Sequence, residues 1–199
     1  MDASPLTSVV VCLSGGPDSI LCAEIARTRV DHSLAAGFFL DYGQPAKEQE
    51  LMSATTYCNA RKVRLFVASV SLEGMQSMRA DSGATGPRIV PGRNGIIISL
   101  ALNVAASIGA QEVWYGAISD DSTNYPDCSS DWIAKMNVLA QSGNNPPLRV
   151  RAPIKLLRKS EVLAELDARG IELAQHWSCY SPVAGMPCLR CNSCLLRNA

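Results

Sequence analysis

Six residues near the start of the chain, Ser-Gly-Gly-Pro-Asp-Ser at positions 14–19, have the composition of an anion-binding loop. They follow an apolar run and precede a helical pattern. At a helix start the backbone N–H groups point outward and the helix dipole adds partial positive charge. Glycines let the backbone approach an anion closely, and Ser14 and Ser19 can donate hydroxyl hydrogen bonds. The stretch predicts a phosphate site, although a plain glycine turn capped by Asp18 or Ser19 has the same local pattern.

The residues around this loop exclude the two commonest nucleotide-binding motifs. A Walker loop requires G-x-x-x-x-G-K-[ST], and no lysine stands near positions 14–19. The G-x-G-x-x-G of dinucleotide-binding folds is also missing. A phosphate at this loop would therefore be bound by a different kind of motif.

Four of the eight cysteines crowd the C-terminal end of the chain in the pattern C-x8-C-x2-C-x2-C. The four are Cys179, Cys188, Cys191 and Cys194. Four thiolates in one short segment match a tetrahedral structural zinc site, with every position filled by protein. The last three cysteines are also spaced closely enough for an iron–sulfur cluster, and we favour zinc. The other four cysteines are scattered through segments that are expected to be buried or half-buried: Cys12, Cys22, Cys58 and Cys128. Of these, Cys12 and Cys22 flank the loop at 14–19 and are expected to be inert core thiols.

Further polar residues stand where the predicted strands end or the predicted helices begin. Asp-Tyr-Gly-Gln at 41–44 follows the second strand, on the edge where open α/β sheets bind ligands. Arg93 opens an apolar helix, where its charge is unfavourable, so we expect it to meet a phosphate or carboxylate. Asp121 and Asp127 follow the fourth strand and suit either magnesium or a purine amine. Lys159 opens a later helix and offers a mobile point charge to phosphates.

The elements that must position these residues alternate along the chain. Short apolar runs predict strands at residues 8–13, 34–40, 63–69 and 112–117, with a weaker candidate at 148–153. Periodicity predicts helices at about 18–29, 46–61, 93–108, 129–141 and 159–168. The alternation predicts an α/β fold with a doubly wound, mainly parallel, five-stranded sheet. We expect one domain at residues 1–177, a small zinc-binding appendix at 178–199 and a long loop at 71–92.

Composition limits the classes of protein that remain. The 199 residues, 47% hydrophobic and 18% charged, suffice for one domain with a substantial core. Eighteen basic and 18 acidic residues give no net charge, which disfavours general binding to nucleic acid. The N-terminus lacks the features of a signal peptide, and the most apolar stretch is shorter than a membrane span of about 20 residues. We expect a cytoplasmic protein that contacts no membrane.

The loop at 14–19 resembles the S-G-G-x-D-S signature of PP-loop ATPases, in which ATP transfers AMP to an acceptor oxygen and the loop holds the leaving pyrophosphate. Residues 9–197 resemble the 7-cyano-7-deazaguanine synthase family. Five segments carry this second resemblance: LDYGQ at 40–44, VPGRN at 90–94, the segment from Gly116 to the YPDC at 125–128, APIKLLRKSEV at 152–162 and the four C-terminal cysteines.

The resemblance implies a PP-loop (HUP-like) fold and an ATP-dependent ligase with ATP, magnesium and zinc as cofactors, acting as a homodimer. Its substrates would be 7-carboxy-7-deazaguanine and ammonia, and its product the nitrile, formed through adenylated acid and amide intermediates. Catalytic roles are implied for Asp18, Arg93 and Lys159. The implied ATP-binding residues are Leu13, Ser14, Gly15, Gly16, Pro17, Asp18, Ser19, Ile20 and Gly116. The implied substrate-binding residues are Tyr42, Gln44, Arg93, Asn94, Asp121, Tyr125 and Asp127.

Two alternative functions fit parts of the same pattern. The adenylating machinery of a repurposed relative would act on another carboxylate, such as that of a peptide or protein. A tRNA-modifying PP-loop protein would bind RNA and use the cysteines for an iron–sulfur cluster. The neutral net charge argues against this last alternative.

Overall fold

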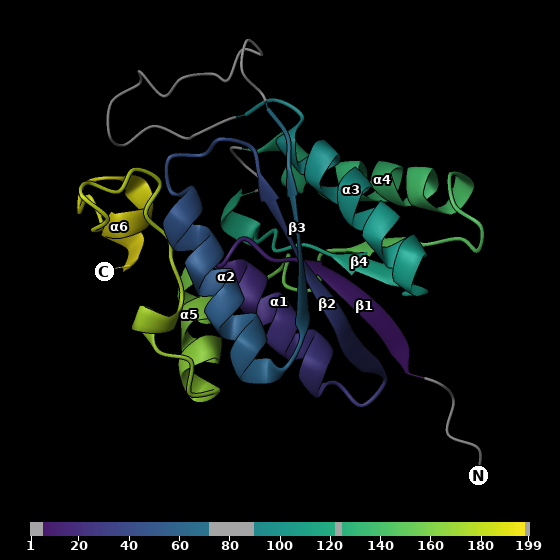
Figure 1. The fold of residues 1–199 in the computed structure, drawn as a ribbon, viewed down its shortest axis with the longest axis horizontal. Helices are drawn as coiled ribbons and strands as arrows, with labels where there is room; N and C mark the ends of the chain where they lie inside the picture. The colour runs from purple at the N-terminus through teal and green to yellow at the C-terminus, as the bar shows by residue number, and fades with distance from the viewer. Residues whose placement is uncertain (1–5, 72–89, 122–124, 198–199) are drawn as a thin grey trace.

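The computed structural model describes residues 6–71, 90–121 and 125–197, and its centre is a five-stranded sheet (Figure 1). All four strand pairings are parallel, in the order β3-β2-β1-β4-β5. The strands are β1 Thr7–Cys12, β2 His32–Asp41, β3 Arg64–Ser69, β4 Glu112–Trp114 and β5 Arg149–Arg151. From β1 the chain adds β2 and β3 on one side of the sheet and then β4 and β5 on the other. Open α/β sheets bind ligands at such a switch point, here at the carboxyl ends of β1 and β4.

Helices cover both faces of the sheet (Figure 1). One face carries α1 Pro17–Thr28, α2 Lys47–Arg61 and α5 Lys159–Ala168, and the other carries α3 Arg93–Ile108 and α4 Ser130–Ser142. A short helix, α6 Asn192–Arg197, lies in the cysteine-rich segment beyond the sheet. Three 3-10 helices lie elsewhere in the described chain, at Ser119–Asp121, Pro126–Cys128 and Leu173–Gln175. The doubly wound α/β fold expected from the sequence is thus confirmed.

The two layers of core follow from the alternation of side chains along β1. Val9 and Val11 pack with α1, α2 and α5, whereas Val10 and Cys12 pack with α3 and α4. All of these side chains are buried, because successive residues of a strand point to opposite faces and both faces are covered. The continuous apolar run that identifies β1 in the sequence has this cause.

Helix starts also follow local rules. Pro17 stands at the start of α1, where its missing N–H leaves no hydrogen bond unmade, and Asp18 places a negative charge in the first turn. Ser129 caps α4 by accepting a hydrogen bond at Oγ from the Trp132 N–H at 3.2 Å. Both helices begin within one residue of the sequence-based expectation.

The structure differs from the sequence-based elements in several places, including β2, which spans His32–Asp41 where 34–40 was expected. The strand expected at 112–117 ends at Trp114, because the chain turns there and the Ala117 N–H donates to the Tyr115 carbonyl. The fifth strand is reduced to Arg149–Arg151, and α6 was not predicted. The long loop expected at 71–92 falls almost wholly outside the described residues. Within the described ranges, no helix has the length and apolarity needed to cross a bilayer.

Candidate active site

The Ser-Gly-Gly loop joins the carboxyl end of β1 to the first turn of α1, as the sequence predicted. Ser14 Oγ accepts a hydrogen bond from the Gly16 N–H at 3.3 Å and lies 3.2 Å from Ser19 Oγ, which also donates to the Gly16 carbonyl at 2.8 Å. The two hydroxyls therefore stand side by side over the start of the helix. This arrangement of hydroxyls and helix amides suits a phosphate group.

Gly15 holds the loop against α2 and against the segment that leads into the cysteines. Its carbonyl accepts hydrogen bonds from Ser53 Oγ at 2.8 Å and from the Trp177 N–H at 2.9 Å. Its φ is 77°, in the left-handed region, and a Cβ at this position would lie 2.3 Å from the Glu50 carbonyl oxygen. Only glycine satisfies both the dihedral angle and the close approach. The shape of the loop is therefore fixed by contacts from distant parts of the chain.

Gly116 serves a similar purpose at the end of β4. A Cβ there would lie 2.9 Å from the Asp18 carbonyl carbon and 3.0 Å from the Ser19 nitrogen. The bare backbone lets the β4 segment lie directly against the first turn of α1. The candidate phosphate loop, residues 14–19, is consequently held by close backbone approaches at Gly15 and at Gly116.

A charged cluster lies beside the loop, between α1 and α5. Lys159 Nζ donates to both oxygens of Asp18, at 2.7 and 2.5 Å, and the Lys159 backbone N–H donates to Asp120 Oδ2 at 2.8 Å. Burial, together with the negative charge of Asp18, raises the pKa of Asp121 to about 6. The cluster thus concentrates carboxylates and one ammonium group next to the phosphate loop.

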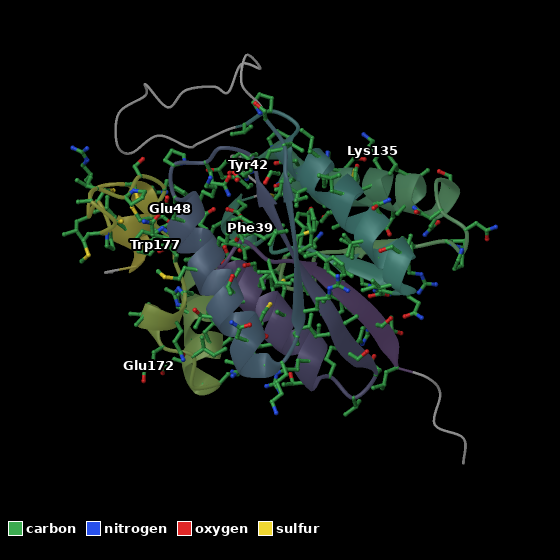
Figure 2. All side chains as sticks on the ribbon, viewed as in Figure 1. Phe39, Tyr42, Glu48, Lys135, Glu172 and Trp177 are labelled. Carbon is green, nitrogen blue, oxygen red and sulfur yellow. The ribbon has the colours of Figure 1, made fainter. Side chains whose placement is uncertain are left out.

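The opposite side of the site carries a guanidinium group. Arg93 opens α3 and donates from Nη1 to Tyr42 Oη at 3.3 Å. Its Nε is buried and has no hydrogen-bond partner among the residues that the structure describes. A buried, unmatched N–H is costly, so this guanidinium is suited to an additional acceptor. Tyr42 and Trp177 lie toward the same end of the molecule, with Glu48 at the start of α2 (Figure 2).

One cavity of about 500 Å³ connects the phosphate loop, the charged cluster and Arg93. Most of the residues singled out in the sequence line it: Leu13, Ser14, Gly16, Pro17, Asp18, Ser19, Tyr42, Gln44, Arg93, Asn94, Gly116, Asp121, Tyr125 and Lys159. The cavity volume is in the range of small-molecule sites, which are about 300–1,000 Å³.

Three of the expected site residues lie outside the cavity wall. Gly15 is beneath the loop, against α2, and Ile20 is fully buried in the core. Asp127 presents its backbone carbonyl to Tyr115 Oη at 3.2 Å, and its side chain is not among those that line the cavity.

Other lining residues were not anticipated from the sequence. Glu50 in the first turn of α2 is one, and the cysteine-rich segment supplies others: Trp177, Ser178, Tyr180, Asn192 and Ser193. Nothing in the spacing of Glu50 marks it, because an acidic residue in a first helical turn is common. The aromatic residues on either side of Cys179 are the only local sign that this segment faces a ligand.

The four predicted metal-ligating cysteines come together. Their Sγ atoms all lie within 4.8 Å of one another, and Cys188 Sγ and Cys194 Sγ are 3.9 Å apart. Backbone N–H groups donate to two of the sulfurs, from Cys188 to Cys179 at 3.2 Å and from Cys191 to Cys188 at 3.3 Å. Hydrogen bonds from backbone N–H groups, led by that of Arg190, lower the pKa of Cys188 to about 6. Burial raises the pKa values of Cys179 and Cys194, so of the shifted cysteines only Cys188 favours the thiolate without a metal. The four cysteines form a cluster compatible with metal binding.

The parallel sheet, its strand order and the Ser-Gly-Gly loop at its centre define an α/β protein of the PP-loop ATPase class. Solved structures share this fold. A U34-tRNA thiolase from Methanococcus maripaludis with its [4Fe-4S] cluster matches with a TM-score of 0.60 at 15% identity, over 98% of this chain and 65% of that one. NMN synthetase from Francisella tularensis matches with a TM-score of 0.59 at 14% identity, over 94% of this chain and 71% of that one.

Sequence comparison narrows the class to a family. The model for the queuosine biosynthesis protein QueC matches residues 8–199, and the chain belongs to that family. A 7-cyano-7-deazaguanine synthase from Marinobacter nauticus is 33% identical over 96% of this chain and 90% of its own length. Another from Campylobacter curvus is 32% identical over 96% of this chain and 92% of its own length. The family resemblance carried by the short motifs is therefore confirmed.

Proposed function

We propose that this chain is an ATP-dependent ligase that converts 7-carboxy-7-deazaguanine and ammonia to 7-cyano-7-deazaguanine. The observation that carries the proposal is that the Ser-Gly-Gly loop and the Arg93 guanidinium line a single cavity, in a chain of the QueC family. One end of that cavity suits a pyrophosphate and the other suits a carboxylate. An enzyme that adenylates an acid needs these two sites side by side.

The chemistry would run in two adenylation steps. The substrate carboxylate attacks the α-phosphorus of ATP, forming an O–P bond as pyrophosphate leaves, and ammonia then displaces AMP to give the amide. The amide oxygen attacks a second ATP in the same way, and loss of AMP and both amide protons leaves the nitrile. These steps demand alignment of two anions and stabilisation of the leaving groups more than a proton shuttle.

The loop would hold the phosphates. Ser14 and Ser19 would donate from their hydroxyls, and backbone N–H groups at the start of α1 would complete the cradle. Lys159, which lies 2.7 Å from Asp18 Oδ1, would exchange this ion pair for the phosphates when ATP binds. Leu13, Pro17, Ile20 and Gly116 would shape this half of the site.

Asp18 and Asp121 are the residues that we expect to hold magnesium. Carboxylate oxygens are the ligands that this ion prefers, and a divalent cation would offset the repulsion and burial that raise the pKa of Asp121. When bound, magnesium would neutralise charge on the ATP phosphates. Lys159 would then remain as the second cation of the cluster.

The acid would lie on the Arg93 side of the cavity. Arg93 would bind the substrate carboxylate through its buried Nε–H, with Tyr42 orienting the guanidinium. Asn94 and Tyr125 supply further polar groups on the cavity wall, and Gln44 lies nearby. Asp127 remains a sequence-based prediction as a substrate residue.

The metal of the cysteine site is proposed to be zinc. A single tetrahedral ion with Zn–S bonds of about 2.3 Å needs sulfurs about 3.8 Å apart, and the observed spacings of 3.9 Å and below 4.8 Å fit one ion. Cysteines that bind separate irons of a cluster would stand farther apart. Metal analysis and a visible absorption spectrum test this. A brown protein that contains iron and no zinc would contradict the proposal.

We also propose a cytoplasmic homodimer with a domain at residues 1–177 and a metal-binding segment at 178–199. Eight free cysteines suit a reducing compartment. Val183, Met186 and Leu189 are 58%, 67% and 67% exposed, and such apolar side chains on one small segment suit coverage by a second copy. Light scattering after size exclusion tests the dimer, and a monomer at all concentrations would contradict it.

The ligase activity is tested by ATP–pyrophosphate exchange and AMP formation with magnesium and ammonium present. We expect both with 7-carboxy-7-deazaguanine and neither with 7-deazaguanine, which lacks the acceptor carboxylate. Mass spectrometry should detect first the amide and then the nitrile. If the acid drives neither exchange nor AMP formation in a metal-loaded, folded protein, the proposed function is wrong.

A further inference from the structure

Glu50 is a carboxylate in the cavity wall that the steps above do not use. It lies in the first turn of α2 and is half-buried. Its Oε2 accepts a hydrogen bond from Gln44 Nε2 at 3.1 Å. Burial raises the pKa of Glu50, while the charge of Arg93 acts in the opposite direction. A carboxylate removed from water in this way needs hydrogen-bond donors.

Gln44 fixes the orientation of this carboxylate. Its Oε1 accepts from the Tyr42 N–H at 2.9 Å, and its Nε2 donates to the Leu40 carbonyl at 3.1 Å as well as to Glu50. Both ends of the amide are thus bound to the backbone at the carboxyl end of β2. The amide cannot rotate without breaking these contacts, so it holds Glu50 Oε2 in place.

The helix that carries Glu50 is equally fixed. The Glu50 carbonyl lies against Gly15 so closely that a Cβ there would be 2.3 Å away, and Ser53 donates to the Gly15 carbonyl. The position of Glu50 is therefore set by the same contacts that shape the phosphate loop. Rigid placement of this kind is typical of groups that determine specificity.

The cavity offers two opposite charges to a ligand. Arg93 requires an acceptor for its buried Nε–H, and Glu50 requires donors. A carboxylate is an acceptor-only group with two oxygens in one plane, so it pairs best with two adjacent N–H groups. The fitting ligand carries a carboxylate at one end and paired N–H donors at the other.

We infer that Glu50 binds the N1–H and 2-amino edge of the 7-deazaguanine acid, with Gln44 as the residue that positions it. This assignment rests on the proposed function. A guanine-type ring presents N1–H and the 2-amino group as neighbouring donors. Adenine presents one amino group beside an acceptor nitrogen, which a carboxylate would repel. Glu50 therefore distinguishes the acid from the adenine ring of ATP and from acids that lack the amino group.

The test compares two acids and two variants. The acids are 7-carboxy-7-deazaguanine and its analogue with hydrogen in place of the 2-amino group. The variants are Glu50→Gln, which replaces one acceptor by a donor, and Glu48→Gln, a matched control at an exposed position in the same helical turn that does not line the cavity. AMP formation gives KM and kcat for each pair, and metal content and unfolding midpoint verify the fold.

Wild type should prefer the acid that carries the 2-amino group. Glu50→Gln should raise the KM for this acid by about 10- to 100-fold, the loss in affinity expected when hydrogen bonds to a charged group are removed. The kcat and the KM for ATP should change little. The preference over the analogue should shrink by a similar factor. Glu48→Gln should match wild type. Glu50→Asp, which keeps the charge but shortens the side chain, should retain part of the preference.

Two results would overturn the assignment while leaving the proposed function intact. The first is that Glu50→Gln prefers the acid with the 2-amino group over its analogue by the same factor as the wild type does. The second is a rise in the KM of ATP with no change in that of the acid, which would place Glu50 at the nucleotide. If wild type forms AMP with neither acid, the proposed function itself is refuted, and the assignment falls with it.

Discussion

Replacing Gly15 by alanine tests whether the phosphate loop is packed as the structure describes. Alanine at a φ of 77° costs about 1–2 kcal/mol, because the Cβ then lies close to the backbone. The same Cβ would be 2.3 Å from the Glu50 carbonyl oxygen and 3.0 Å from the Ala54 nitrogen, and these backbone atoms cannot move aside by rotation. Overpacking of this kind costs about 1–3 kcal/mol more.

Gly15→Ala should therefore lower the free energy of unfolding by about 2–5 kcal/mol, and the unfolding midpoint by about 4–20 °C for a chain of this size. Gly43→Ala is the matched control. Gly43 has a φ of 83°, and an added Cβ meets nothing within 4 Å. This control isolates the dihedral cost, so its loss should be about 1–2 kcal/mol.

The assay is urea-induced unfolding of the metal-loaded protein, followed by tryptophan fluorescence, with equal metal content confirmed for both variants. Any gain from a stiffer unfolded chain is common to both substitutions and cancels in the difference. The difference of about 1–3 kcal/mol therefore measures the contact between the loop and α2. Equal losses in the two variants would refute the close packing of Gly15 against Glu50.

Three further predictions concern the charged cluster and the metal site. Lys159→Met should lower kcat by about 100- to 1,000-fold in the AMP assay, whereas Lys135→Met, at an exposed ion pair on α4, should match wild type. Ionising Asp121, whose pKa is raised to about 6, costs folding energy, so in magnesium-free buffer stability should fall as pH rises from about 4 to 6 and then level off. Asp121→Asn should make this slope less negative in urea titrations at several pH values, because the shifted carboxylates that remain, Glu50 among them, still contribute. A slope equal to that of the wild type would contradict the assignment. Cys191→Ser should release the metal and lower the unfolding midpoint, measured by metal analysis and calorimetry, while full metal retention would argue against four-thiolate ligation.

The parts of the molecule that the sequence predicted well are those with local causes. A strand buried on both faces must be continuously apolar, which is why β1 is visible as Val9–Val11 with its flanking residues. Pro17 and Asp18 mark the start of α1 because that position tolerates proline and favours a negative charge. The cysteine spacing is short enough for one segment to supply all four ligands, so the metal site needed no knowledge of the fold.

The parts that escaped prediction depend on contacts between distant residues. Lys159 and Asp18 are 141 residues apart, and only the packing of α5 beside α1 brings them to 2.5 Å. Lys159 was expected to face phosphates, and its partnership with Asp18 has no sequence signal. Glu50 was missed for the same reason, since only the fold places it in the cavity wall, beside Gln44 and against Gly15.

The cysteine segment contributes to the neighbouring cavity as well as to the four-cysteine cluster. Trp177 donates its backbone N–H to the Gly15 carbonyl at 2.9 Å and its Nε1–H to the Cys179 carbonyl at 2.8 Å. One residue thus connects the loop at 14–19 to the backbone of Cys179, the first cysteine of the cluster. The same segment supplies Tyr180 and Ser193 to the cavity wall. Because four thiolates fold around a metal as a unit, the wall and the hydrogen bond to Gly15 are expected to form together with the metal site. The metal would then act on catalysis only through these contacts, by fixing the loop that we propose holds the pyrophosphate.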